Sequence, residues 1–74
     1  MKTYLKIMFN SEGALPSEIK DNLLNLGFEA TKGNYDFVYN WRKDIAEVEE
    51  LVYFADKVHA SLKNCNVYFS IETI

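Results

Sequence analysis

Residue types that cross-link small proteins, take part in catalysis or shape the backbone are scarce in this chain of 74 residues. It has one cysteine, one histidine, one proline and three glycines. A single cysteine excludes an internal disulfide, so packing must stabilise the fold, and it favours a reducing compartment. The one histidine has no second ligand at metal-binding spacing. We therefore expect no metal, no cofactor and no enzymatic activity.

Long apolar runs and an excess of positive charge are missing as well. Lys6 interrupts the apolar N-terminal segment, which is therefore too short for a signal peptide, and no stretch has the length of a membrane span. The net charge is −3, and the eight lysines and arginines are scattered along the chain. Nucleic-acid binders usually show a basic stripe, so the charge argues against such a partner. We expect a cytoplasmic protein that does not contact a membrane.

Apolar and aromatic residues are abundant by contrast. They make up 49% and 15% of the chain, respectively, which is enough for one packed core. The length is close to the lower limit for a self-sufficient domain, and a dimer interface could add stability. We expect a single domain over residues 1–74.

The segment 28–41, FEATKGNYDFVYNW, is the most informative part of the sequence. Gly33-Asn34 separates two runs in which large apolar and polar residues alternate, and a glycine at the first central position suits a type II′ hairpin turn. A two-residue loop sets the register, so that Glu29 faces Val38. Opposed residues share a face of the sheet. One aromatic-rich face is therefore expected to point to the core: Phe28, Ala30, Tyr35, Phe37, Tyr39 and Trp41.

Two amphipathic helices flank this hairpin. The first is expected over 16–26, with Pro16 at its first position and Gly27 as its C-terminal cap. Its apolar stripe consists of Leu15, Ile19, Leu23 and Leu26. The second is expected over 44–63, where Asp44 and Glu47 have the spacing of a capping box. Its apolar stripe consists of Val48, Leu51, Val52, Ala55, Val58 and Leu62. Tyr53 and Phe54 lie off this main stripe. Either the stripe is wide or Phe54 flanks it, and Tyr53 is expected at the surface.

Alternating residues predict two further strands, at 3–9 and 67–72. The order β-α-β-β-α-β resembles the ferredoxin-like split βαβ sandwich. That resemblance implies an α+β fold with an antiparallel sheet of order 4-1-3-2 and both helices on one face. Six apolar residues of the first and last predicted strands should then join the core: Leu5, Ile7, Phe9, Val67, Phe69 and Ile71.

The opposite, open face of the sheet is the first candidate site. If the strand at 3–9 is central, a small apolar patch is expected there, made of Tyr4, Met8, Val38 and Tyr68. Such a patch would bind a protein partner or a second copy of the chain. The alternative is an ordinary exposed sheet face with scattered apolar residues.

The loop before the first predicted helix is a second candidate. The run NSEGAL at 10–15, followed by Leu26-Gly27, resembles the first strand–helix junction of ACT regulatory domains. The resemblance implies that a small molecule, an amino acid, binds at a dimer interface through backbone groups near the helix N-terminus. The candidate residues are Asn10, Ser11, Gly13 and Ala14. An ordinary amphipathic helix would show much the same pattern.

Two further interpretations need separate mention. Lys32-Gly33 followed by Tyr35–Tyr39 loosely resembles the third strand of RNA-recognition motifs, in which aromatic side chains stack on bases. The hairpin register instead directs these aromatics to the core, which argues against RNA binding. His59 falls within the apolar arc of the second predicted helix, where the alternatives are a satisfied core histidine, a histidine at the rim and a buried general base. Cys65 is expected in a turn as an inert thiol, with Lys63 as the only nearby cation in sequence.

The sequence therefore predicts a small non-catalytic interaction or regulatory module that associates through its open sheet face or an edge strand, with a homodimer as one form of this association. The alternative is an ACT-like domain that binds an amino acid through the loop at 10–16. An enzyme, which would need polar groups that converge around His59, is the third interpretation, and RNA binding is a less favoured one.

Overall fold

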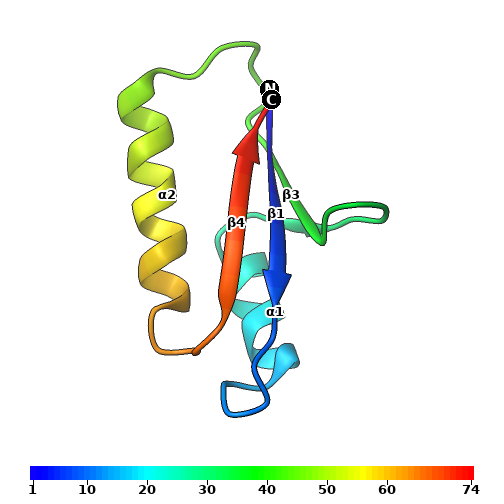
Figure 1. The fold of residues 1–74 in the computed structure, drawn as a ribbon. Coiled ribbons are helices and arrows are strands. Elements are labelled where there is room, and N and C mark those ends of the chain that lie inside the picture. Colours follow the sequence, from blue (N-terminus) through cyan, green and yellow to red (C-terminus); the bar gives the residue numbers. More distant parts are fainter.

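The computed structural model describes residues 1–74 and shows four strands and two helices (Figure 1). The elements are β1 Lys2–Met8, α1 Pro16–Asn25, β2 Glu29–Ala30, β3 Phe37–Asn40, α2 Val48–Leu62 and β4 Tyr68–Thr73. The sheet is antiparallel with the order β2-β3-β1-β4. The predicted ferredoxin-like topology, order 4-1-3-2 read from the other edge, is confirmed.

The predicted hairpin register is also confirmed. Glu29 pairs with Val38 and Ala30 with Phe37, and the Thr31 N–H donates to the Asp36 carbonyl oxygen at 3.0 Å. Beyond this bond the two strands separate, so β2 has only two residues and β3 only four. β1 is central and pairs with β3 on one side and with β4 on the other.

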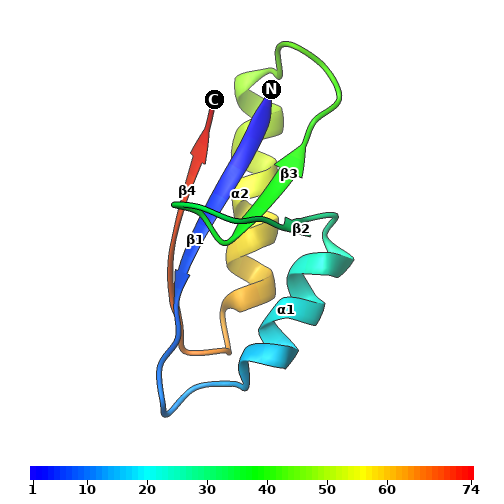
Figure 2. The same ribbon diagram turned by 90° about the vertical axis from the view of Figure 1, so that its right-hand side faces the viewer.

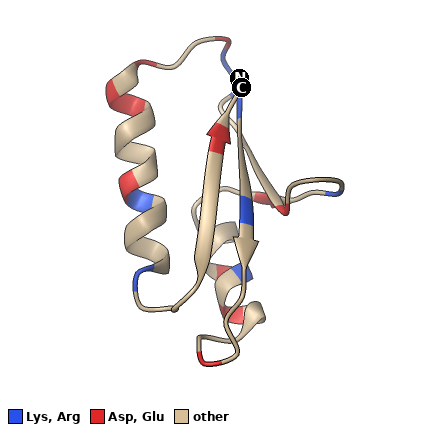
Figure 3. Ribbon diagram, viewed as in Figure 1, with Lys and Arg blue, Asp and Glu red and all other residues tan.

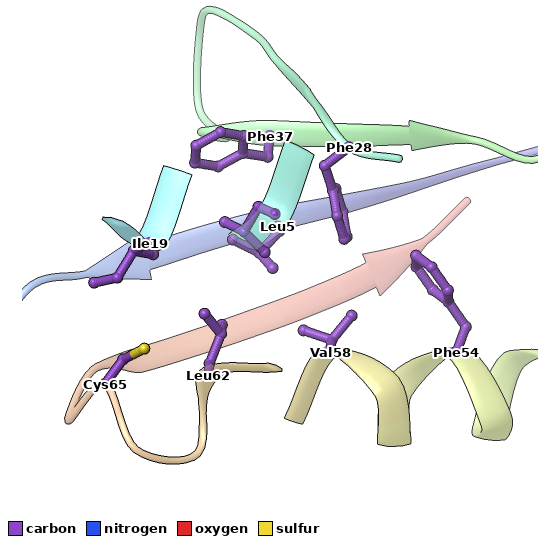
Figure 4. Close-up of a cluster of buried hydrophobic side chains, with 9 residues drawn as sticks. Leu5, Ile19, Phe28, Phe37, Phe54, Val58, Leu62 and Cys65 are labelled. Atoms are coloured by element: carbon purple, nitrogen blue, oxygen red, sulfur yellow. The ribbon is translucent and has the colours of Figure 1, made fainter. Parts of the chain in front are cut away.

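The core lies between one face of the sheet and the two helices (Figure 4). Leu5 and Phe37 enter it from the sheet and Phe28 from the residue just before β2, and all three are buried. The helices and the turn before β4 contribute the remaining members of the cluster: Ile19, Leu23, Phe54, Val58, Leu62 and Cys65. Because both helices bury side chains against the same sheet face, the opposite face stays open.

Phe54 is the centre of an aromatic cluster at the β3 side of α2. Its ring centroid lies 4.4 Å from that of Tyr39, 5.2 Å from that of Trp41 and 5.5 Å from that of Phe28. Aromatic pairs at such distances are favourable beyond the area that they bury. This contact rotates α2 so that Phe54, rather than the predicted stripe alone, faces the core.

The rotation of α2 overturns three assignments. Val48 and Val52, predicted in the buried stripe, are 70% and 55% exposed. His59, which the helical wheel placed in the apolar arc, is exposed. The helical period predicted for α2 is correct, but the predicted centre of its buried stripe is wrong. The large side chain of Phe54 determines which side of the helix packs on the aromatic end of β3.

The start of α2 also differs from the prediction. The helix begins at Val48, and its capping box joins Glu47 with Glu50 rather than Asp44 with Glu47. The Glu47 N–H donates to Glu50 Oε1 at 3.4 Å, and Lys43 forms an ion pair with the same carboxylate. The Lys43 contact, assisted by the Glu47 N–H, lowers the pKa of Glu50 below its ordinary value.

Two predicted core residues lie near the surface instead. Leu15 is 62% exposed because it is the N-cap of α1, where its carbonyl oxygen accepts the N–H groups of Glu18 and Ile19. Phe9 is exposed because β1 ends at Met8. Gly27 does end the helical segment, with φ of 103°. Neither helix has the length and apolar character needed to cross a membrane.

Candidate functional site

The open sheet face brings the four predicted patch residues together as two pairs. Tyr4 faces Val38 across β1 and β3, and Met8 faces Tyr68 across β1 and β4. Lys6, which faces Ser70, lies between the two pairs along β1. The patch therefore consists of two pairs, which the polar pair of Lys6 and Ser70 separates.

One end of this face is covered by the tip of the hairpin. Residues 31–36 leave the ladder and extend across the open side of the sheet toward β4 (Figure 2). The ring centroid of Tyr35 lies 4.9 Å from that of Tyr4, and its hydroxyl donates a hydrogen bond to the Glu72 carboxylate. This hydrogen bond raises the pKa of Tyr35 above its ordinary value.

The position of Tyr35 corrects the prediction that placed it on the core side. Strand alternation holds only while the strands stay paired, and the ladder ends at Ala30 and Phe37. Beyond it, Gly33 has a φ of 99° and the chain bends over the open face. The alternation rule therefore applies to Phe37, which is buried, and to Tyr39, but not to Tyr35.

Asp36 fixes the base of this loop to β1. Its backbone N–H donates to the Leu5 carbonyl oxygen at 2.9 Å, and its Oδ2 accepts the Ile7 N–H at 2.9 Å. The carboxylate thus satisfies a donor of β1 at the point where β3 no longer runs alongside. An acidic residue within an alternating strand gives no sequence signal for this role.

The other end of the patch is uncovered. Met8 and Tyr68 are 67% and 70% exposed, whereas Tyr4 and Val38 are half-buried. A shallow groove of about 250 Å³ lies beside Met8 and Tyr68 and is lined also by Lys6, Ile7, Phe69 and Ser70. The accessible apolar surface of the open face is therefore concentrated between the ends of β1 and β4.

The loop at 10–15 is tightly bound to the rest of the chain. The N–H groups of Glu12 and Gly13 donate to Asn10, and that of Ala14 donates to the Cys65 carbonyl oxygen at 3.0 Å. A Cβ at Gly13 would lie 2.5 Å from this carbonyl oxygen, which explains the glycine by close backbone approach. Among the candidate residues of the ACT-like interpretation, the backbone N–H groups of Gly13 and Ala14 therefore already have acceptors.

The remaining reactive residues do not converge. His59 is exposed on α2, and Cys65 is buried with its Sγ 3.8 Å from Asn22 Nδ2. No group of three His, Cys, Asp or Glu side chains is arranged to hold a metal ion. Acidic and basic segments are interspersed over the ribbon (Figure 3).

No protein-family model matches this chain, and neither a curated protein nor a solved structure is significantly similar to it.

Proposed function

We propose that this protein is a small non-catalytic interaction module that binds a protein partner through the uncovered end of its open sheet face. The observation that carries the proposal is the juxtaposition of Met8 and Tyr68. These two large side chains face each other on neighbouring strands, and about two thirds of each is exposed.

The chemistry of this pair suits protein recognition. Methionine adapts to irregular apolar surfaces, and tyrosine offers a large apolar ring with a polar end at little entropic cost. Tyrosine is also enriched among the residues that contribute most to binding energy. Lys6 and Ser70 border the pair and supply a polar rim. We place the interaction in the cytoplasm, since the only thiol of the chain is free and buried.

Site-specific photo-crosslinking tests this proposal. A photoreactive phenylalanine analogue is introduced at position 68, in the cell that expresses the protein, and adducts are identified by mass spectrometry. The matched control carries the analogue at Tyr53, which is similarly exposed, at 66%, on α2. We expect a discrete adduct from position 68 and none of the same mass from position 53.

A second variant shows whether the adduct depends on the pair. Met8→Lys places a charge opposite position 68 and should remove most of the adduct, whereas Leu24→Lys on α1 should leave it unchanged. Equal labelling from positions 53 and 68, or an adduct that Met8→Lys leaves intact, would count against an interface at this end of the sheet.

A further inference from the structure

We propose that two copies of this protein pair edge to edge through β4, forming a continuous antiparallel sheet across a two-fold axis. β4 is an edge strand with β1 as its only neighbour. The opposite edge, β2, has two residues, whereas β4 has six. This inference goes beyond the proposed function because it uses the free edge of β4 and not the open sheet face.

The backbone hydrogen bonds show which groups of β4 are free. Lys2 and Ile74 exchange both of their backbone hydrogen bonds, at 3.0 and 2.9 Å. In an antiparallel ladder every second residue pair repeats this arrangement. The residues of β4 in register with it are Glu72, Ser70 and Tyr68, which therefore bond to β1. The backbone groups of the alternate residues point away from β1: Phe69, Ile71 and Thr73.

The free edge has few of the features by which proteins usually block strand pairing, and its one charged side chain is Glu72. Such edges commonly carry proline, lysine or a bulge, or are very short. β4 has the sequence YFSIET, without proline or lysine, and its register with β1 is unbroken over all six residues. It offers three N–H and three C=O groups in one row.

A second copy of β4 fits this row in one register. With the two-fold axis at Ile71, Phe69 of each copy faces Thr73 of the other, and the three donors of each copy meet the three acceptors of its neighbour. All free backbone groups are then used. Ser70 faces Glu72 of the second copy on the open side of the sheet. An axis at Glu72 would instead oppose two carboxylates, and like charges directly opposite each other are unfavourable.

The helix layer leaves apolar surface on the same side. Phe54 of α2 faces β3 through the Tyr39 ring, and the backbone carbonyl oxygen of Ser61 accepts a hydrogen bond from Asn22 Nδ2 of α1. At about 100° per residue, Val48 and Val52 lie on the opposite flank of α2, next to the β4 edge of the sheet. Both are more than half exposed. Pairing of β4 would place a second copy against this flank and reduce that exposure.

Charge substitutions at Ser70 test both the dimer and its register. With Ser70→Glu, two carboxylates face each other at two places across the interface. With Ser70→Lys, a lysine faces a glutamate at the same two places. At the usual strength of cross-strand pairs, we expect the dissociation constant to rise about 2- to 30-fold with glutamate and to fall by a similar factor with lysine. Sedimentation velocity over a wide concentration range measures both changes.

Monomer stability provides an internal control, because Ser70 also faces Lys6 of the same copy. Ser70→Glu gains an attraction with Lys6 and Ser70→Lys gains a repulsion, so each variant should change monomer stability and dimer affinity in opposite directions. Met8→Lys should leave the dimer intact even if it removes the partner of the open face, which separates the two proposals. A monomer at every concentration, or a dimer indifferent to charge at position 70, would overturn pairing through β4.

Discussion

The hydroxyl of Thr3 joins three parts of the chain at one end of the sheet. Trp41 Nε1 donates to Thr3 Oγ1 at 2.7 Å, and the hydroxyls of Thr3 and Thr73 lie 2.8 Å apart. Thr3 is the one polar residue that is fully buried, with 1% of its surface exposed. Thr3 occupies a core-facing position of β1. A polar side chain is tolerated there because its hydroxyl accepts the hydrogen bond of the indole N–H.

Thr3→Val should therefore destabilise the protein although it preserves the shape of the side chain. The substitution leaves the Trp41 N–H without its acceptor, and we expect the free energy of unfolding to fall by about 1–3 kcal/mol, measured by denaturant titration. The loss should be smaller in a Trp41→Phe background, where no indole donor remains. Strictly additive effects of the two substitutions would show that this hydrogen bond does not contribute.

Single residues were the hardest feature to predict from the sequence. Leu5, Ile19 and Val58 follow strand and helix periods and are buried as expected. Phe54 and His59 could not be placed, because the rotation of α2 depends on which aromatic side chains meet it. That contact forms between parts of the chain far apart in sequence, and a helical wheel contains no information on it.

At the level of elements, the hairpin shows where local rules end. Its register follows from the two-residue turn and is the same in the structure. The tip, however, bends across the open face because Tyr35 finds a ring and a carboxylate there, and Asp36 ties its base to β1. Neither partner could be identified from the segment 28–41 alone.

The raised pKa of Tyr35 makes this loop sensitive to alkaline pH. Because the folded pKa lies above the ordinary value of 10.0, the bond to Glu72 stabilises the closed loop below that pH. This contribution is lost as the pH rises through the raised pKa, since tyrosinate cannot donate.

Tyr35→Phe should remove the hydrogen bond to Glu72 at neutral pH as well, because phenylalanine has no hydroxyl to donate. We expect faster hydrogen exchange at the Thr31 N–H, which belongs to the base of the loop, with little change in global stability because the bond is exposed. Tyr53→Phe on α2 serves as the control and should leave this exchange rate unchanged. If Tyr35→Phe also leaves it unchanged, the hydroxyl does not hold the loop closed.

At the level of the whole molecule, topology was the most predictable feature. Six well-separated elements with clear periods allow few arrangements, and the structure has the expected one. Only part of the predicted patch is accessible, because the loop of residues 31–36 covers Tyr4 and Val38. The alternation of residues along a strand does not predict such a loop. The two association surfaces that we propose adjoin each other: the pair of Met8 on β1 and Tyr68 on β4 lies on the open face, and Phe69, Ile71 and Thr73 lie at the free edge of β4.

Amide hydrogen exchange at low and high protein concentration tests association along β4 most directly. The Ser70 and Glu72 N–H groups bond to β1 and should be protected equally at both concentrations. The Phe69, Ile71 and Thr73 N–H groups should exchange rapidly in dilute solution and become protected when concentrated. Equal and rapid exchange of these three amides at both concentrations would contradict pairing through this edge.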